Sequence, residues 1–220
     1  MTFSVILPTT GRPTLRYAFE SAASQLAPGD EVIVIRDESD DWGDSPRNSA
    51  MNRASGTHLI FLDDDDEFLP GALEVMRRFA QEHPGRIGIF RQRRVQYGRD
   101  GEIRRVGVTW QDQDVSQTAP PLYCVPNIPG KVGRFRAPAE EPRRGNVAFI
   151  RETIALQGEP VWREECTSVV KPERSRWRRL RYRIALRTRL RRLVARQRRR
   201  AYPEVRSEMG SRSASNDRGL

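Results

Sequence analysis

The 220-residue sequence contains only two cysteines and two histidines, and it has no long apolar run. Cys124 and Cys166 lack metal-ligand spacing, so we interpret both as reduced, small, buried side chains. No segment approaches the roughly 18 apolar residues of a membrane span. The first residues lack the basic and apolar parts of a secretory signal, which predicts a cytoplasmic location. The absence of a GxxxxGK[ST] phosphate loop argues against an ATPase or kinase.

Charge is distributed very unevenly along the chain. Residues 1–170 contain 21 basic and 25 acidic side chains, whereas residues 171–220 contain 18 and 4. Of the 39 basic residues, 37 are arginine. The composition therefore predicts a mildly acidic domain over 1–170, a basic helical tail over 171–205, and a disordered C-terminus over 206–220.

Short apolar runs alternate with segments of helical periodicity in the first 90 residues. Strands are predicted at 3–8, 31–36, 57–62 and 86–90, and helices follow the first three strands. This alternation predicts an α/β fold with a mostly parallel sheet flanked by helices. Further along, we expect a hairpin around Asp100-Gly101 within 94–110, loop over most of 111–145, a helix at 146–158, and one or two strands at 159–170.

Four consecutive aspartates, Asp63–Asp66, follow the third predicted strand in the sequence FLDDDDEFLP. In an open α/β sheet, ligands bind at the carboxyl ends of the strands. That edge would also contain Thr9, Thr10, Arg12 and Asp37 from the loops after the first two strands. Clustered carboxylates suit Mg²⁺ or Mn²⁺, so the pattern indicates a site for a divalent cation. The alternative is an acidic, solvated loop that merely ends a strand.

Three segments together resemble a known family: SVILPTTGRPTLRYAFESAASQ, EVIVIRDES, and SPRNSAMNRASGTHLIFLDDDDEFLPGALE. They are similar to the nucleotide-sugar half of family 2 glycosyltransferases of the GT-A fold. The resemblance covers residues 3 to about 90. It implies a nucleotide-sugar-binding half over 1–90 and an acceptor half over 91–170. The implied reaction is metal-dependent, inverting transfer from a nucleoside-diphosphate sugar to an acceptor hydroxyl.

The resemblance also implies roles for three of the aspartates. Asp63 and Asp65 match the two carboxylates of the DxD element, which holds Mn²⁺ or Mg²⁺ against the donor diphosphate. Asp64 is expected near the donor ribose.

Other donor contacts are implied by position. Pro8 and Thr9 match the loop that lines the nucleotide, and Asp37 matches the carboxylate that binds the donor base. Arg47 matches a basic residue that would contact the diphosphate, although a surface arginine in a first helical turn is an equal alternative. Arg36 stands where many members have an aspartate, which leaves the donor base open.

The catalytic base is the point at which this sequence departs from the family. Inverting transfer needs a base to deprotonate the acceptor hydroxyl. Asn146 stands at the expected carboxylate position, and an amide cannot take that proton. We favour Glu141 or Glu140, a few residues upstream. If the alignment is displaced, the base would instead be one of Glu152, Glu164 and Glu165.

Two other functions are weighed against a transferase. A nucleotidyltransferase shares the sheet and the metal, but no glycine-rich, lysine-bearing first loop is present. A binding protein that holds nucleotide sugar without efficient transfer would also explain Asn146. The basic tail is expected to lie on an anionic membrane surface, making the protein peripheral there, which would suit an acceptor that is lipid-linked or part of an envelope glycan. Non-specific nucleic-acid binding and docking to a partner are the alternatives, and specific nucleic-acid binding is not expected.

Overall fold

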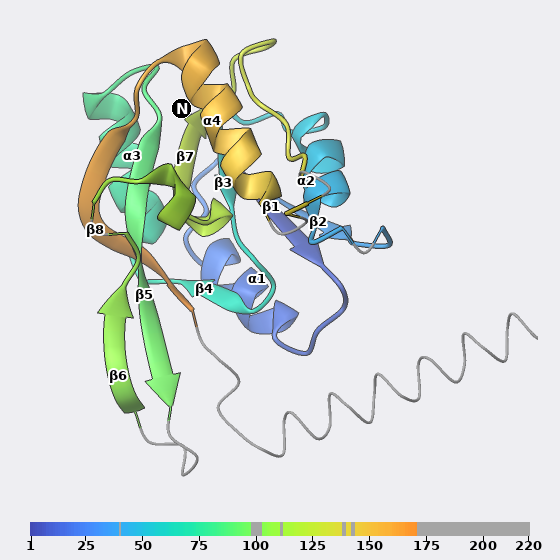
Figure 1. Ribbon diagram of the computed structural model, residues 1–220, viewed down its shortest axis with the longest axis vertical. Helices are drawn as coiled ribbons and strands as arrows, with labels where there is room; N and C mark the ends of the chain where they lie inside the picture. The colour runs from blue at the N-terminus through green and yellow to red at the C-terminus, as the bar shows by residue number, and fades with distance from the viewer. Residues whose placement is uncertain (40, 98–102, 111, 138–139, 142–143, 171–220) are drawn as a thin grey trace, which may run out of the picture. The chain divides into compact units, whose positions relative to one another are not determined.

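The computed structural model describes residues 1–170 except 40, 98–102, 111, 138–139 and 142–143. One eight-stranded sheet runs through this part of the chain, in the order β2-β1-β3-β7-β5-β8-β4, with β6 paired to β5 (Figure 1). The strands are β1 (Phe3–Thr9), β2 (Glu31–Arg36), β3 (His58–Phe61), β4 (Asp66–Phe68), β5 (Gly88–Tyr97), β6 (Ile103–Val108), β7 (Tyr123–Pro126) and β8 (Val161–Val170). The helices are α1 (Leu15–Ala23), α2 (Asp44–Met51), α3 (Ala72–Glu82) and α4 (Gly145–Gln157), with short 3-10 turns η1 (Val115–Gln117) and η2 (Pro120–Leu122).

The sheet separates two apolar cores, and this explains the composition of its central strands. β1 and β3 are buried along their whole length, as continuous apolar runs require. One core packs α1 and α3 against the sheet through residues such as Phe3, Leu73 and Phe79. The other packs α2 and α4 through Phe61 and Phe149, among others. The predicted inward face of α3 is confirmed, since Leu73, Met76, Phe79 and Ala80 are all buried.

The prediction of a mostly parallel sheet is wrong, because the sheet is mixed. β1 pairs in parallel with β2 and β3, and β5 with β8. β7 lies antiparallel between β3 and β5, and β4 lies antiparallel to β8. β7 falls within the segment expected to be loop. Its four residues, Tyr-Cys-Val-Pro, are too few to give a periodic signal between flanking prolines, yet all four are buried.

The predicted hairpin and final strand are present. β5 and β6 pair antiparallel, with Arg93 opposite Val108, while the turn at Asp100-Gly101 lies outside the described residues. A single strand, β8, accounts for the one or two strands expected after α4. The predicted basic tail and disordered C-terminus also lie outside the described residues. None of the described helices has the length and apolar character that crossing a membrane requires.

A glycine sets the start of α2. The helix begins at Asp44 and its N-cap is Gly43, which has a φ of 84°. Such a conformation is readily adopted only by glycine. In the first turn of the helix, the backbone N–H and the hydroxyl of Ser45 both donate to the carboxylate of Asp41, which fixes the loop that precedes α2.

Candidate functional site

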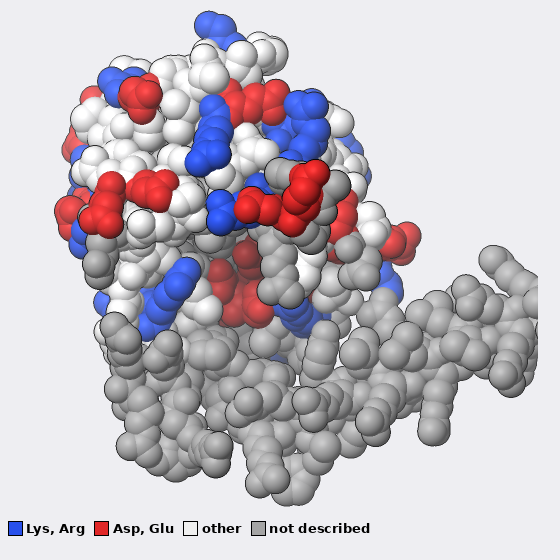
Figure 2. Space-filling view, in the orientation of Figure 1, with Lys and Arg blue, Asp and Glu red and all other residues white. Residues whose placement is uncertain are grey.

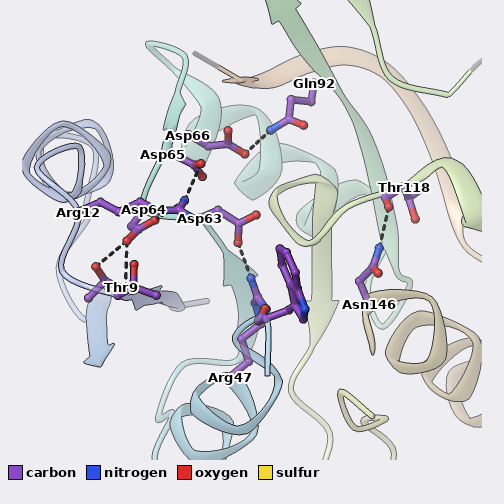
Figure 3. Close-up of polar contacts among 12 residues, drawn as sticks. Thr9, Arg12, Arg47, Asp63, Asp64, Asp65, Asp66, Gln92, Thr118 and Asn146 are labelled. Atoms are coloured by element: carbon purple, nitrogen blue, oxygen red, sulfur yellow. Dashed lines mark hydrogen bonds and ion pairs between the residues drawn. The ribbon is translucent and has the colours of Figure 1, made fainter. Parts of the chain in front are cut away.

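The four aspartates form a turn that joins β3 to β4. The backbone N–H of Asp66 donates to the carbonyl of Asp63 at 3.1 Å, which closes the turn. Because a turn changes direction at each residue, the four side chains meet different neighbours (Figure 3). Figure 2 shows acidic side chains set back near the centre of one face, with basic side chains on either side.

Asp64 connects this turn to the loop after β1. Its residue is only 4% exposed. One carboxylate oxygen accepts from the hydroxyl of Thr9 at 2.7 Å and from the backbone N–H of Thr10 at 3.2 Å. The other accepts from Nη1 of Arg12 at 3.0 Å. Asp64 therefore organises the loop expected to line the nucleotide.

Two arginines offset the charge of the remaining outward-facing aspartates. Nη1 of Arg12 lies 2.6 Å from Oδ2 of Asp65, so one guanidinium bridges Asp64 and Asp65. Nη2 of Arg47 forms an ion pair with Asp63. Arg47 is buried, donates from Nη1 to the carbonyl of Trp42 at 2.9 Å, and lies 5.3 Å from the ring centroid of Phe135. Its guanidinium is thus held rigidly beside the acidic turn.

Asp66, the fourth aspartate, faces a different element. It is buried and accepts from Nε2 of Gln92 on β5 at 2.7 Å. Burial raises the pKa of Asp66 well above its ordinary value, and the negative charges of Asp63 and Asp65 raise it further. Gln92 gives no sequence signal of this contact, because β4 and β5 are brought together only through β8.

The turn retains an excess of negative charge despite its arginines. Removal of water by the surrounding protein raises the pKa of Asp65 even though half of its side chain is exposed, and Asp63 and Asp64 add to the effect, against the opposing charge of Arg12. Carboxylate oxygens are the donors that Mg²⁺ and Mn²⁺ prefer. Among the described residues, no three histidine, cysteine or acidic side chains converge as a metal cage. The set fits a cation that takes one or two carboxylates here and completes its shell with water or phosphate.

The residues predicted to hold the nucleoside lie at the ends of β1 and β2. Pro8 and Thr9 are buried at the end of β1, opposite Ile35 and Arg36 of β2. The backbone N–H of Asp37 donates to the carbonyl of Thr9 at 2.8 Å. The Asp37 carboxylate accepts from Ser39 within its own loop. The structure thus brings Pro8, Thr9 and Asp37 to the same edge as the acidic turn.

The candidates for the catalytic base are less closely tied to the turn. Asn146 donates from Nδ2 to the carbonyl of Thr118 at 2.8 Å, which fixes the loop near η1 to the start of α4. Glu140 and Glu141 are exposed, and Glu141 forms an ion pair with Arg144 at 3.0 Å. The other three candidates are each paired with arginine: Glu152 with Arg136, Glu164 with Arg91, and Glu165 with Arg163.

A further buried carboxylate, that of Asp44 at the start of α2, lies against the start of α4. Its Oδ2 accepts from the backbone N–H of Ala137 at 3.0 Å. A Cβ placed on Gly145 would lie only 2.0 Å from the same oxygen, so glycine is required there. Burial raises the pKa of Asp44. This contact positions the segment that precedes Glu140 and Glu141, and no pattern in the sequence indicates it.

Solved structures share this arrangement of the sheet and its flanking helices. TarS of S. aureus matches with a TM-score of 0.58 and 18% identity over 78% of this chain and 37% of that one. TarS 1–349 in complex with UDP-GlcNAc matches with a TM-score of 0.53 and 19% identity, and the complex with UDP with 0.55 and 18%. These matches cover 79% and 77% of this chain and 60% of each solved chain, so this chain spans less than two thirds of their length.

The sequence match covers part of the chain. Residues 45–137, which include most of α2, the acidic turn and β5, match the model of glycosyl transferase family 2. No curated protein sequence gave a significant match. The chain is therefore similar to glycosyl transferase family 2 over this segment, and its fold is similar to that of TarS.

Proposed function

We propose that this protein transfers a sugar from a nucleoside-diphosphate sugar to an acceptor hydroxyl. The observation that carries the proposal is the position of Asp63–Asp65, at the end of β3 between the β1 loop and α2. The match of residues 45–137 to glycosyl transferase family 2 and the similar solved structures with UDP and UDP-GlcNAc support this choice of donor class. We take a uridine diphosphate sugar as the first donor to test.

The donor would lie across the edge formed by β1, β2 and the acidic turn. Pro8, Thr9 and Asp37 would hold the nucleoside, with Asp64 fixing the Thr9 loop close to the ribose. Arg47 would bind the diphosphate. Its guanidinium is already oriented by the Trp42 carbonyl and Phe135, so little side-chain entropy is lost on binding.

Asp65 and Asp63 would hold Mg²⁺ or Mn²⁺, in keeping with their oxygen donors and excess negative charge. A bound divalent cation stabilises the charge that develops on a leaving diphosphate. The exposed half of the Asp65 carboxylate leaves room for ligands from the donor. Arg12 and Arg47 offset the charge of the same carboxylates when no donor is bound.

We assign the base for inverting transfer to Glu141 or Glu140. Asn146 is excluded chemically, and it is committed as a donor to Thr118. In either position, the glutamate would need its exposed segment to approach the donor site when an acceptor binds. Breaking the ion pair between Glu141 and Arg144 costs little free energy, because exposed ion pairs contribute only ~0–1 kcal/mol.

The experiment measures thermal stability of the full chain against UDP, GDP, TDP and CDP, each with and without Mn²⁺. A ligand that binds only the folded state raises the melting temperature by mass action. We expect one nucleotide to act, and only with metal. Asp65→Asn should abolish that shift, whereas Glu74→Gln, which removes an acidic charge from α3, should retain it. An unchanged shift in Asp65→Asn would refute the metal assignment.

The position of Asn146 favours a second function, that of a nucleotide-sugar binder with little or no turnover. The two functions differ in whether bound donor is consumed. Coupled detection of released nucleoside diphosphate, with candidate sugar acceptors present, distinguishes them. Metal-dependent binding without any release would support the binder.

We also propose that residues 171–205 attach the protein to an anionic membrane surface, where the acceptor would be lipid-linked or part of an envelope glycan. Their 15 arginine and lysine residues up to Arg200, with scattered leucines, support this. Co-sedimentation with phosphatidylglycerol vesicles, but not with phosphatidylcholine vesicles, is expected. Equal sedimentation with both would contradict it.

A further inference from the structure

Strand pairing places an arginine of β5 beside the acidic turn. In the sheet, β8 lies between β4 and β5. Val170 of β8 is opposite Asp66 of β4 on one side and opposite Arg94 of β5 on the other. Adjacent strands are about 4.8 Å apart, so the Asp66 and Arg94 backbones are separated by roughly 10 Å.

Arg94 and Asp66 also share a face of the sheet. Side chains two residues apart on a strand point to the same face, and the pairing of Gln92, Arg93 and Arg94 with β8 is continuous. Gln92 reaches across β8 to Oδ2 of Asp66, which identifies this face as the one that contains the site (Figure 3). Arg94 is therefore the next residue along β5 on the site face. Consistent with this, the charge of Arg94 lowers the pKa of Asp66 against the larger effects that raise it.

The guanidinium of Arg94 differs from those of Arg12 and Arg47. Arg94 is exposed, and it forms no hydrogen bond or ion pair with any described residue. On β6 its opposite residue is Gly107, where an added Cβ would meet nothing within 4 Å. Figure 2 shows basic side chains over β5 beside the recessed acidic group. Within the part of the chain that the structure describes, the surface next to Arg94 is thus uncovered and positively charged.

We infer that Arg94 forms an anion-binding subsite for the acceptor, one that binds a phosphate or carboxylate near the acceptor's reacting hydroxyl. The inference rests on the proposed function, because it divides the site into two sides. Thr9 and Asp37, the nucleoside side, lie at the ends of β1 and β2, whereas Arg94 lies on β5, two strands from Asp66. A cation on the acceptor side offsets the repulsion between an anionic acceptor and the carboxylates of the turn. An exposed arginine whose donors have no partner among the described residues suits a phosphate or carboxylate.

The test compares Arg94→Gln with Arg93→Gln. Arg93 is also exposed and lies one residue away on the same strand, but on the opposite face, where its charge acts on Cys166. Each variant removes one positive charge from β5, so the two variants have the same net charge. Glycerol 3-phosphate is titrated into the full chain saturated with UDP and Mg²⁺, and NMR shifts of the Gln92 and Gly107 amides are followed. Methyl glucuronide and glycerol are the carboxylate and neutral probes.

We expect saturable binding of at least one anionic probe and none of glycerol. Arg94→Gln should weaken that binding about tenfold, as loss of a charged hydrogen bond implies, and Arg93→Gln less than twofold. The better anion identifies the acceptor's charged group. Equal losses in the two variants, unchanged binding in Arg94→Gln, or no saturable binding would overturn the subsite.

Failure of the proposed function gives a different result. Absence of any response to UDP with Mg²⁺ would refute the donor site. Titration of glycerol 3-phosphate without nucleotide would still compare Arg94→Gln with Arg93→Gln, and so would report on the subsite alone.

Discussion

Asp64 and Asp65 are adjacent and chemically identical, yet the structure predicts opposite consequences for their loss. Asp64 is buried and accepts three hydrogen bonds, from Thr9, Thr10 and Arg12. Asp64→Ala leaves the buried hydroxyl of Thr9 without its acceptor, at about 1–3 kcal/mol for an unsatisfied buried group. Thr10 is exposed, and Arg12 retains Asp65 and is partly exposed, so the loss of their contacts adds little. We expect a destabilisation of ~1–3 kcal/mol.

Asp65→Asn should leave stability almost unchanged. Its ion pair with Arg12 is half-exposed and contributes at most ~1 kcal/mol. The substitution also removes repulsion by Asp63 and Asp64, which opposes that loss. Metal-dependent nucleotide binding, in contrast, should disappear, because the open carboxylate is the one removed.

Urea unfolding measures the first effect, and the melting shift with UDP and Mn²⁺ measures the second. The comparison requires both measurements on both variants. Asp64→Ala should still show a metal-dependent shift at saturating UDP if its folded fraction is adequate. A loss of under ~1 kcal/mol in Asp64→Ala would show that its network does not hold the β1 loop. A destabilisation of Asp65→Asn as large as that of Asp64→Ala would contradict the division of roles.

Three further predictions concern the start of α4. Burial raises the pKa of Asp44. The wild-type protein should therefore lose folding stability as pH rises from about 4 through that raised pKa, because the buried group must ionise. Asp44→Asn has no such ionisation, so its stability relative to wild type should increase over the same pH range in urea unfolding. Gly145→Ala should destabilise by more than ~2 kcal/mol because its Cβ would meet Asp44, and adding Asp44→Ala should recover part of the loss in a double-mutant cycle. Asn146→Asp should lower stability by ~1–3 kcal/mol, since a carboxylate cannot donate to the Thr118 carbonyl, and a melting temperature equal to wild type would contradict that contact.

Local patterns in the sequence were sufficient to predict the strands and helices on the donor side of the fold. β1, β3 and α3 have strong periodic or continuous apolar signals, and each is confirmed. The convergence of Thr9, Asp37 and the aspartates follows from a general rule, because parallel strands end at one edge. The sequence could not show which arginines would contact which aspartates, since Arg12 and Arg47 come from separate loops.

The acceptor side could not be predicted from local patterns, because it is formed by pairings between segments that are distant in the sequence. β7 has four residues and enters the sheet antiparallel between β3 and β5, so no local signal announces it. The contact of Gln92 with Asp66 needs β8, which is some 70 residues further along the chain, to lie between their strands. The same holds for Asp44 and Gly145, whose contact requires α2 and α4 to meet. Burial of these polar groups is a tertiary property, and a single sequence has no pattern for it.

Different neighbours offset the charge of each aspartate, and this explains how four of them can end a buried strand. Arg47 offsets Asp63, the β1 loop binds Asp64, and burial beside Gln92 favours the neutral form of Asp66. Asp65 is the one aspartate of the four with a half-exposed side chain, and it forms an ion pair with a single nitrogen of Arg12, Nη1. A cation that binds together with a diphosphate would therefore find the most accessible carboxylate of the turn at Asp65. If the turn were one residue longer, the side chains would exchange neighbours, and a buried carboxylate would lose its partner.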